Sequence, residues 1–228
     1  MTPATSQTER NVRAELLHAA VEILDKDGPD ALQTRKIASA AGTSTMAVYT
    51  HFGGMPALIA AVADEGLRQF DAALTMAPTS DPVADLMATG IAYRRYAIER
   101  PHMYRLMFGS TSAHGINAPA HDLLTLTVAE INDHYPSFAH VVRGVHRCML
   151  AGRIAAGSAS DDATVVAVAA QFWSSIHGFV MLELAGFYGA QGSAIGPVLG
   201  SLTTNLLIAL GDLPTRVHES QRLAVEPR

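Results

Sequence analysis

Residues 34–52 read TRKIASAAGTSTMAVYTHF, and this stretch predicts two short helices joined by a turn. Thr34 can cap the first helix with its hydroxyl, and good helix formers follow it up to Gly42. Glycine tolerates the left-handed conformation that a tight helix exit needs. Ser44 or Thr43 can then cap the second helix. Two short helices about a glycine turn make a helix-turn-helix, whose second helix has the dimensions to enter the major groove of DNA.

The segment before this motif predicts a longer amphipathic helix. From about Thr8 to Asp27, apolar residues recur at spacings of three and four, as on one face of a helix. Gly28 suits a C-terminal cap and Pro29 cannot continue the helix, so it ends there. The sequence therefore predicts a compact three-helix head over residues 1–53. The short second helix can direct three side chains into its core: Ala47, Val48 and Phe52.

The motif resembles the DNA-binding signature of the TetR family of bacterial repressors. The matching residues are Ile37-Ala38, Ala40-Ala41-Gly42, Val48-Tyr49-Thr50-His51-Phe52, Gly53-Gly54 and Leu58. The likeness covers roughly residues 10–60 and is specific, because residue type and spacing match together. The resemblance implies that Tyr49 and His51 contact phosphate. Met55 stands where the family often has a lysine that grips phosphate, so that contact is not carried over to this chain.

Most of the residues expected to contact DNA are small or uncharged. The N-terminal end of the second helix reaches base edges in this docking geometry, where Met46 or Ala47 can touch a thymine methyl. Tyr49 and Thr50 are better placed for phosphate, although Tyr49 can alternatively pack within the head and leave Thr50 solvated. The predicted DNA-binding residues are Thr34, Arg35, Lys36, Thr43, Ser44, Thr45, Met46, Ala47, Tyr49, Thr50 and His51.

Residues 54–212 predict a larger helical body for ligand binding and dimerisation, followed by a frayed tail at 213–228. Helical periodicity recurs through the body, with no strand-period alternation, so the fold class is all-α. A loop is expected at 109–118 and a turn at 157–162. The expected helices are approximately 54–77, 82–100, 101–108, 119–134, 137–156, 161–186 and 193–211.

Two segments of the body supply aromatic, methionine and polar side chains suited to a small-molecule cavity between helices. Plain core packing is the alternative for each residue taken separately. Trp173, His177 and Gly178 resemble the Trp…His-Gly (WHG) pattern of a C-terminal domain found in one branch of the TetR family. The predicted pocket residues are Met103, Tyr104, Met107, Phe108, Phe172, Trp173, Ile176, His177, Val180 and Met181.

Composition excludes several other classes. The formal charge of −5 over 228 residues argues against a nonspecific polycation that coats nucleic acid. The single cysteine, Cys148, cannot form a disulfide within the chain. The histidines lack metal-ligand spacing, and no nucleophile and base form a recognisable pair, so we expect no metal, no cofactor and no enzymatic activity. The polar N-terminus and the lack of about 20 unbroken apolar residues predict a cytoplasmic protein without membrane contact.

These features predict a homodimeric transcriptional repressor. Two heads would read half-sites of a near-palindromic operator in double-stranded DNA, and a small, largely apolar effector would release them. The last two long helices are expected to form the dimer interface, with Gly178, Ala185 and Gly200 allowing close approach. The alternatives are an activator or an effector-free regulator with a filled core, and an enzyme or carrier that has kept the head as an interaction module.

Overall fold

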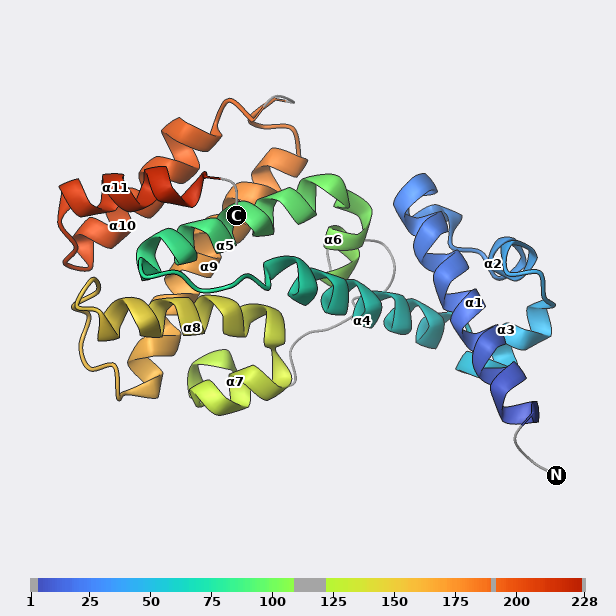
Figure 1. Cartoon of the computed structure of the whole chain (residues 1–228). Helices are drawn as coiled ribbons and strands as arrows, with labels where there is room; N and C mark the ends of the chain where they lie inside the picture. Colours follow the sequence, from blue (N-terminus) through green and yellow to red (C-terminus); the bar gives the residue numbers. More distant parts are fainter. Residues whose placement is uncertain (1–3, 109–121, 190–191, 227–228) are drawn as a thin grey trace. The chain divides into compact units, whose positions relative to one another are not determined.

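The computed structural model describes residues 4–108, 122–189 and 192–226 (Figure 1). These residues form eleven α-helices, two 3₁₀ turns and one π-helix, and they contain no strand. The predicted all-α fold is therefore confirmed. The chain divides into two compact units, which are Met1–Gln69 with Glu99–Ala120, and Phe70–Ile98 with His121–Arg228.

The first unit contains the helix-turn-helix and the helices that support it. Its elements are α1 (Ala4–Asp27), the turn η1 (Pro29–Ala31), α2 (Thr34–Ala40), α3 (Thr45–Phe52), the first part of α4 (Met55–Leu74) and α6 (Pro101–Met107). Each of the first four helices has fully buried apolar side chains, and α1, α2 and α3 pack against one another. The buried residues include Leu16 and Leu24 of α1, Ile37 of α2, Val48 of α3 and Leu58 of α4. α2 and α3 have only seven and eight residues, and helices of that length are stabilised mainly by such packing. The predicted bounds of α2 and α3 agree with the structure to within about a residue.

The caps of the two short helices differ from the prediction. Thr34 was expected to cap α2, but it is the first residue of that helix, and Gln33 occupies the cap position without a side-chain hydrogen bond. Ser44 does precede α3, yet its hydroxyl makes no capping bond either. Gly53 ends α3 in the left-handed conformation at φ 75°, and its amide donates to the carbonyl of Tyr49. The helix-turn-helix is therefore ended by glycine geometry and held by core packing.

The second unit is a helical bundle around α8 and α9. It contains the end of α4, α5 (Pro82–Glu99), the turn η2 (Leu123–Thr125), α7 (Val128–His134), α8 (Pro136–Leu150), α9 (Asp162–Leu184), the π-helix η3 (Ile195–Gly200), α10 (Ser201–Ala209) and α11 (Pro214–Ala224). α8 packs along α9, and α10 packs against α11 (Figure 1). Apolar side chains from α5 and α7 to α11 form one continuous core. The apolar stripes that the sequence predicts on the long helices therefore contribute to this core.

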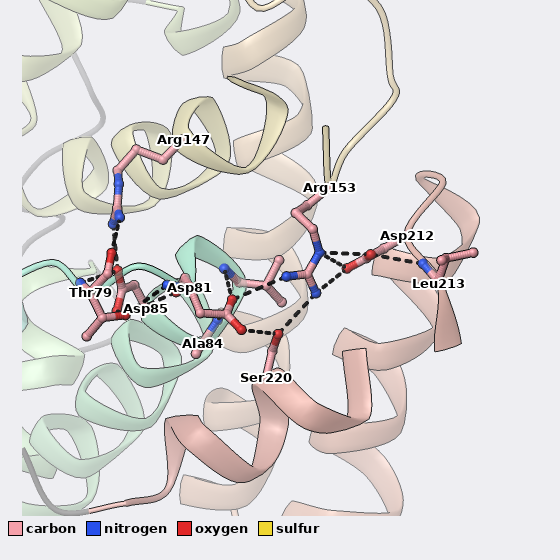
Figure 2. Close-up of polar contacts among 10 residues, drawn as sticks. Thr79, Asp81, Ala84, Asp85, Arg147, Arg153, Asp212, Leu213 and Ser220 are labelled. Carbon is pink, nitrogen blue, oxygen red and sulfur yellow. Dashed lines mark hydrogen bonds and ion pairs between the residues drawn. The ribbon is translucent and has the colours of Figure 1, made fainter. Parts of the chain in front are cut away.

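A buried polar cluster joins the start of α5 to α11 (Figure 2). Arg153 follows α8 and donates from Nε to both carboxylate oxygens of Asp212, each at 2.9 Å. Its other nitrogens reach Ser220 Oγ at 3.0 Å and Asp81 Oδ1 at 3.3 Å, and Ser220 donates to Asp81 Oδ2 at 2.6 Å. Burial acts to raise the pKa of Asp81, but the hydrogen bonds from Ser220 and from the Ala84 amide lower it overall. The cluster is therefore held mainly by charge-assisted hydrogen bonds.

Two expectations for the C-terminal part of the chain are wrong. The segment from Leu213 was expected to be frayed, but Pro214–Ala224 forms α11, and its Val217 and Ser220 are fully buried. The expected helix at 193–211 is divided into η3 and α10. Pro197 explains this division, because proline has no amide to donate and its ring clashes with the preceding turn.

Two further helices are clearly shorter than expected. The helix expected at 137–156 is α8, which ends at Leu150. Of the expected helix 119–134, the residues that the structure describes form only η2 and α7. Thr127 caps α7 in a capping box with Glu130, a local signal that explains why this helix begins where it does. The predicted loop 109–118 lies outside the described residues.

Candidate DNA-binding surface and cavity

α3 presents one buried and one exposed face. Val48 is fully buried, whereas Met46 is 68% exposed and Tyr49 is 57% exposed. The side chains of Ser44, Thr45 and Thr50 are also exposed, and those of Thr43, Ala47 and His51 are half-buried. The Thr50 hydroxyl donates to the Met46 carbonyl at 3.1 Å, so its proton is already used within the helix. Tyr49 therefore points away from the core, which disfavours the alternative in which it packs within the head.

Few cations lie on the helix-turn-helix. Arg35 and Lys36 of α2 are exposed and Thr34 is half-buried. Lys36 Nζ forms an ion pair with Asp27 Oδ2 of α1 at 2.6 Å, and this hydrogen bond is the main reason that the pKa of Asp27 is lowered. Arg13 of α1 lies over the Phe52 ring, 4.6 Å from its centroid. Arg35 is thus the exposed cation of α2 that makes no ion pair with a described residue.

The predicted pocket residues of α6 lie in the first unit. Met103, Tyr104 and Met107 are buried, and the Tyr104 and Phe108 rings lie 4.8 Å apart. Met103 Sδ would come within 2.4 Å of a Cβ atom at Gly66, so α6 approaches α4 at a position where only glycine fits. Arg100 at the start of α6 pairs with Asp25 of α1. The α6 side chains therefore pack within the first unit.

The Trp…His-Gly residues of α9 form a hydrogen-bond chain with α5. Trp173 Nε1 donates to the hydroxyl of Tyr93 at 3.3 Å, and that hydroxyl lies 3.1 Å from His177 Nδ1. Because Trp173 donates to the hydroxyl oxygen, the Tyr93 hydroxyl can donate its own hydrogen bond to His177 Nδ1. This bond requires a neutral imidazole that carries its proton on Nε2. Burial lowers the pKa of His177 and so favours this neutral form. The arrangement supports a structural role for His177.

A cavity of about 150 Å³ lies in the second unit. Its walls come from α5, α8, α9, η3, α10 and the last residues of α11. Of the predicted pocket residues, Phe172 and Ile176 line it. Trp173 and His177 lie one step around α9 and bond to Tyr93, which is itself a lining residue. Val180, Met181, the three α6 residues and Phe108 are not among those that line it.

Much of this cavity is not predicted from the sequence, because the patterns of its wall segments indicate core or tail. Thr89 and Gly90 interrupt the apolar stripe of α5 with a polar and a small residue, and both line the cavity. Gly196 and Gly200 flank Pro197 in η3 and also line it, as does Gln221 of α11. Two sequence signals could have indicated these cavity walls. One is the polar or small residues inside an apolar stripe, and the other is the proline between two glycines inside a predicted helix.

Comparison with known proteins identifies the family. The family described as "Bacterial regulatory proteins, tetR family" matches residues 16–62. The domain described as "Tetracyclin repressor-like, C-terminal domain" matches residues 86–199, which is half of the chain and includes the Trp…His-Gly residues. The chain therefore belongs to the TetR family, and it is a transcriptional regulator with a DNA-binding helix-turn-helix.

Three relatives illustrate the breadth of the similarity. An uncharacterised HTH-type transcriptional regulator of Mycobacterium tuberculosis is 27% identical over 179 residues, which are 76% of this chain and 71% of the relative. A protein of unknown function from Rhodococcus sp. RHA1 is 27% identical, with a TM-score of 0.66 over 88% of this chain and 96% of that one. RolR in complex with resorcinol, at 16% identity, shares the fold with a TM-score of 0.62 over 97% of each chain.

Other chemistry finds little support in the residues that the structure describes. They contain no group of three or more His, Cys, Asp or Glu side chains able to hold a metal ion. The Cys148 thiol is buried, and burial raises its pKa to about 12, so it stays protonated near neutral pH. Regulators of this family are generally not enzymes. α9 is long and apolar enough to cross a membrane, but the core helix of a bundle has the same properties. The side chains of Val165, Ala169 and Phe172 on α9 are buried in the bundle.

Proposed function

We propose that this chain is a homodimeric repressor, located in the cytoplasm, that leaves its operator when a small, largely apolar effector binds. The observation that carries DNA recognition is the exposure of Met46 and Tyr49 on α3, on either side of the fully buried Val48. The N-terminal residues of α3 would face base edges, and Tyr49 and His51 would contact phosphate. Because these groups are mostly uncharged, hydroxyls and backbone amides supply much of the binding.

Dimerisation would supply the specificity that one head lacks. A twofold dimer presents two recognition helices to half-sites about 34–36 Å apart. Gly178 and Leu182 of α9 and Ala185 directly after it are exposed and recur at intervals of three and four. A Cβ atom at Gly178 would meet no neighbour within 4 Å. Leu202 and Ala209 of α10 are exposed as well. These faces can pair with those of a second copy as a four-helix bundle.

The role expected for Gly200 in this interface needs correction. A Cβ atom at Gly200 would lie 3.2 Å from Gln221 Nε2 of the same chain. Gly200 therefore allows α11 to approach η3 and is not available to a second copy. The proposed interface rests on the exposed faces of α9 and α10 instead.

Effector release follows from linkage. A ligand can release DNA only if it binds better to a conformer whose two heads are wrongly spaced. α4 is one helix whose residues belong to both units, which supports its role as the connector between ligand binding and head spacing. The cavity in the second unit and the resorcinol complex of RolR support a ligand-responsive body. A cavity argues against the alternative of an effector-free regulator with a filled core.

A gel-shift experiment with DNA that flanks the protein's own gene tests this function. We expect a shift that survives an excess of unrelated competitor DNA, and a weaker shift for Tyr49→Ala. Leu150→Ala, which changes an exposed apolar residue of α8, is the control and should bind as the unmodified protein does. A reporter whose transcription rises on addition of the protein would indicate an activator. The absence of any competitor-resistant shift would overturn the DNA-binding proposal altogether.

A further inference from the structure

We propose that the cavity in the second unit binds an uncharged, single-ring-sized molecule with one hydrogen-bonding group, and that Gln221 of α11 is the residue that recognises this group. This inference rests on the proposed effector function, because it names the ligand class and the recognition residue of the effector site. The proposed site differs from the pocket that the sequence predicts, because residues of α11 and η3 help to line it and residues of α6 do not.

The size and the walls of the cavity define the occupant. An apolar cavity of about 150 Å³ has room for a molecule the size of benzene. Leu86, Phe172, Ile176 and Leu199 form apolar walls, and no charged side chain is among the described residues that line it. A charged ligand would lose its hydration there without an ionic partner, which is costly. The occupant is therefore neutral and mostly apolar.

Among the described residues that line the cavity, Gln221 alone has a side chain whose hydrogen-bonding capacity is wholly available. The Thr89 hydroxyl donates to the Asp85 carbonyl at 3.0 Å, and the Thr203 hydroxyl donates to the Leu199 carbonyl at 3.0 Å. The Tyr93 hydroxyl is engaged by Trp173 and His177. The Gln221 amide is half-buried and makes no hydrogen bond to any residue that the structure describes. A hydroxyl, carbonyl or amide on the ligand can satisfy it, whereas a pure hydrocarbon cannot.

The π-helix gives the cavity its second wall. Four of the six residues of η3 line the cavity, and Gly196 and Gly200 among them bring backbone to its surface. The amide of Leu199 reaches back five residues to the carbonyl of Ala194 at 3.4 Å, as a π-helix requires. π-helical turns are rare and occur frequently at functional sites. The missing side chain at Gly200 also leaves the space in which the Gln221 amide lies.

α11 is anchored on one side and borders the cavity on the other. Val217 and Ser220 are fully buried, and Ser220 belongs to the polar cluster around Arg153 (Figure 2). One residue further on, Gln221 lines the cavity, as do Ala224 and Val225 at the end of the helix. The anchored middle of α11 thus fixes the position of Gln221.

Binding of small probe molecules to the full-length protein without DNA tests this assignment. The probes are benzyl alcohol, toluene and benzoate, and binding is followed by NMR chemical-shift titration and by thermal unfolding. Benzyl alcohol should bind at least about fivefold more tightly than toluene, since a hydrogen bond is worth roughly 1 kcal/mol. Gln221→Leu should remove this preference and leave toluene binding unchanged. Benzoate should bind at least tenfold more weakly than benzyl alcohol.

A pair of neighbouring threonines supplies the matched control. Thr203 lines the cavity and Thr204 does not, although both are half-buried on α10. Thr203→Phe should fill the cavity and weaken both neutral probes at least tenfold, whereas Thr204→Phe should bind them as the unmodified protein does. Equal binding by the two variants, benzoate binding as tightly as benzyl alcohol, or no binding of either neutral probe would each overturn the cavity assignment.

The same variants separate this inference from the proposed function. If the probes bind as expected but operator affinity does not respond to them or to any other occupant of the cavity, the site stands and effector release fails. If another molecule releases the protein from DNA equally well in the Thr203→Phe variant, effector release stands and the cavity assignment fails.

Discussion

Arg153 and Asp212 form a buried ion pair in which Arg153 Nε lies 2.9 Å from each carboxylate oxygen of Asp212. Both residues are only 5% exposed, and they lie 59 positions apart in the sequence. The pair ties the segment after α8 to the loop before α11, and through Ser220 and Asp81 it also reaches the start of α5. The pair should therefore stabilise the fold and hold α11 against the bundle.

Asp212→Ala should destabilise the protein by about 3–5 kcal/mol, because it leaves the Arg153 guanidinium buried without its main partner. Urea unfolding followed by circular dichroism measures this change. Arg68→Ala is the control, since Arg68 pairs with Glu65 on the exposed surface of α4 and its loss should be too small to separate from the unmodified protein. Similar unfolding midpoints for the two variants would show that the buried cluster does not hold α11 in place.

Acid should destabilise the protein through His177. Burial lowers its pKa below the ordinary value of 6.5, so the unfolded chain takes up this proton more readily than the folded protein. The contribution to stability is complete above about pH 6.5 and is lost progressively as the pH falls through the folded pKa. Unfolding midpoints at several pH values between 7.5 and 5 measure this loss.

His177→Gln should reduce this pH dependence. The pKa of His140 is also lowered, because burial outweighs the hydrogen bond that its Nε2 donates to the Asp71 carboxylate, so His140→Gln should remove a separate part of the same dependence. NMR titration of the imidazole protons assigns each midpoint. A His177 midpoint above 6.5 would contradict the buried neutral imidazole that accepts the Tyr93 proton.

The sequence was sufficient for features that depend on local signals. Gly42 and Gly53 end the two helices of the motif, and the apolar spacing from Leu16 to Leu24 aligns α1, so the head follows from short-range chemistry. Each long apolar stripe of the body also predicted a real helix. The family resemblance then added the DNA-binding role.

Features that depend on distant partners were missed. α11 reads PTRVHESQRLA and has low hydropathy, with Val217, Ser220 and Ala224 as its buried positions. Ser220 is buried because Arg153, 67 positions away, donates to it, and no local pattern indicates that contact. The ion pair of Lys36 with Asp27 likewise crosses from α2 to α1. The cavity was misplaced for the same reason, since its walls combine residues from α5 to α11.

The proposed dimer interface can be tested at Leu182. This side chain is 43% exposed on the face of α9 that includes Gly178 and Ala185. Leu182→Arg should place two charges against each other across the twofold axis and yield monomers in light scattering coupled to size exclusion. Leu150→Arg changes an even more exposed leucine of α8 outside the proposed interface and should leave the dimer intact. A dimeric Leu182→Arg variant would mean that another face of the protein mediates assembly.

The ion pair between Lys36 and Asp27 should restrain DNA binding. Lys36 lies on α2, the helix that crosses the DNA backbone in this docking geometry, but its ammonium is held 2.6 Å from the Asp27 carboxylate. Asp27→Asn removes that negative charge and frees Lys36 for a phosphate. We expect tighter operator binding and a salt dependence steeper by about one released counterion, measured by fluorescence anisotropy across a series of salt concentrations. Asp133→Asn, which removes an exposed charge from α7, should change neither quantity, and Lys36→Met in the Asp27→Asn background should cancel the gain. An unchanged salt slope in Asp27→Asn would place Lys36 outside the contact with DNA, and Arg35 would then be the cation of α2 that binds phosphate.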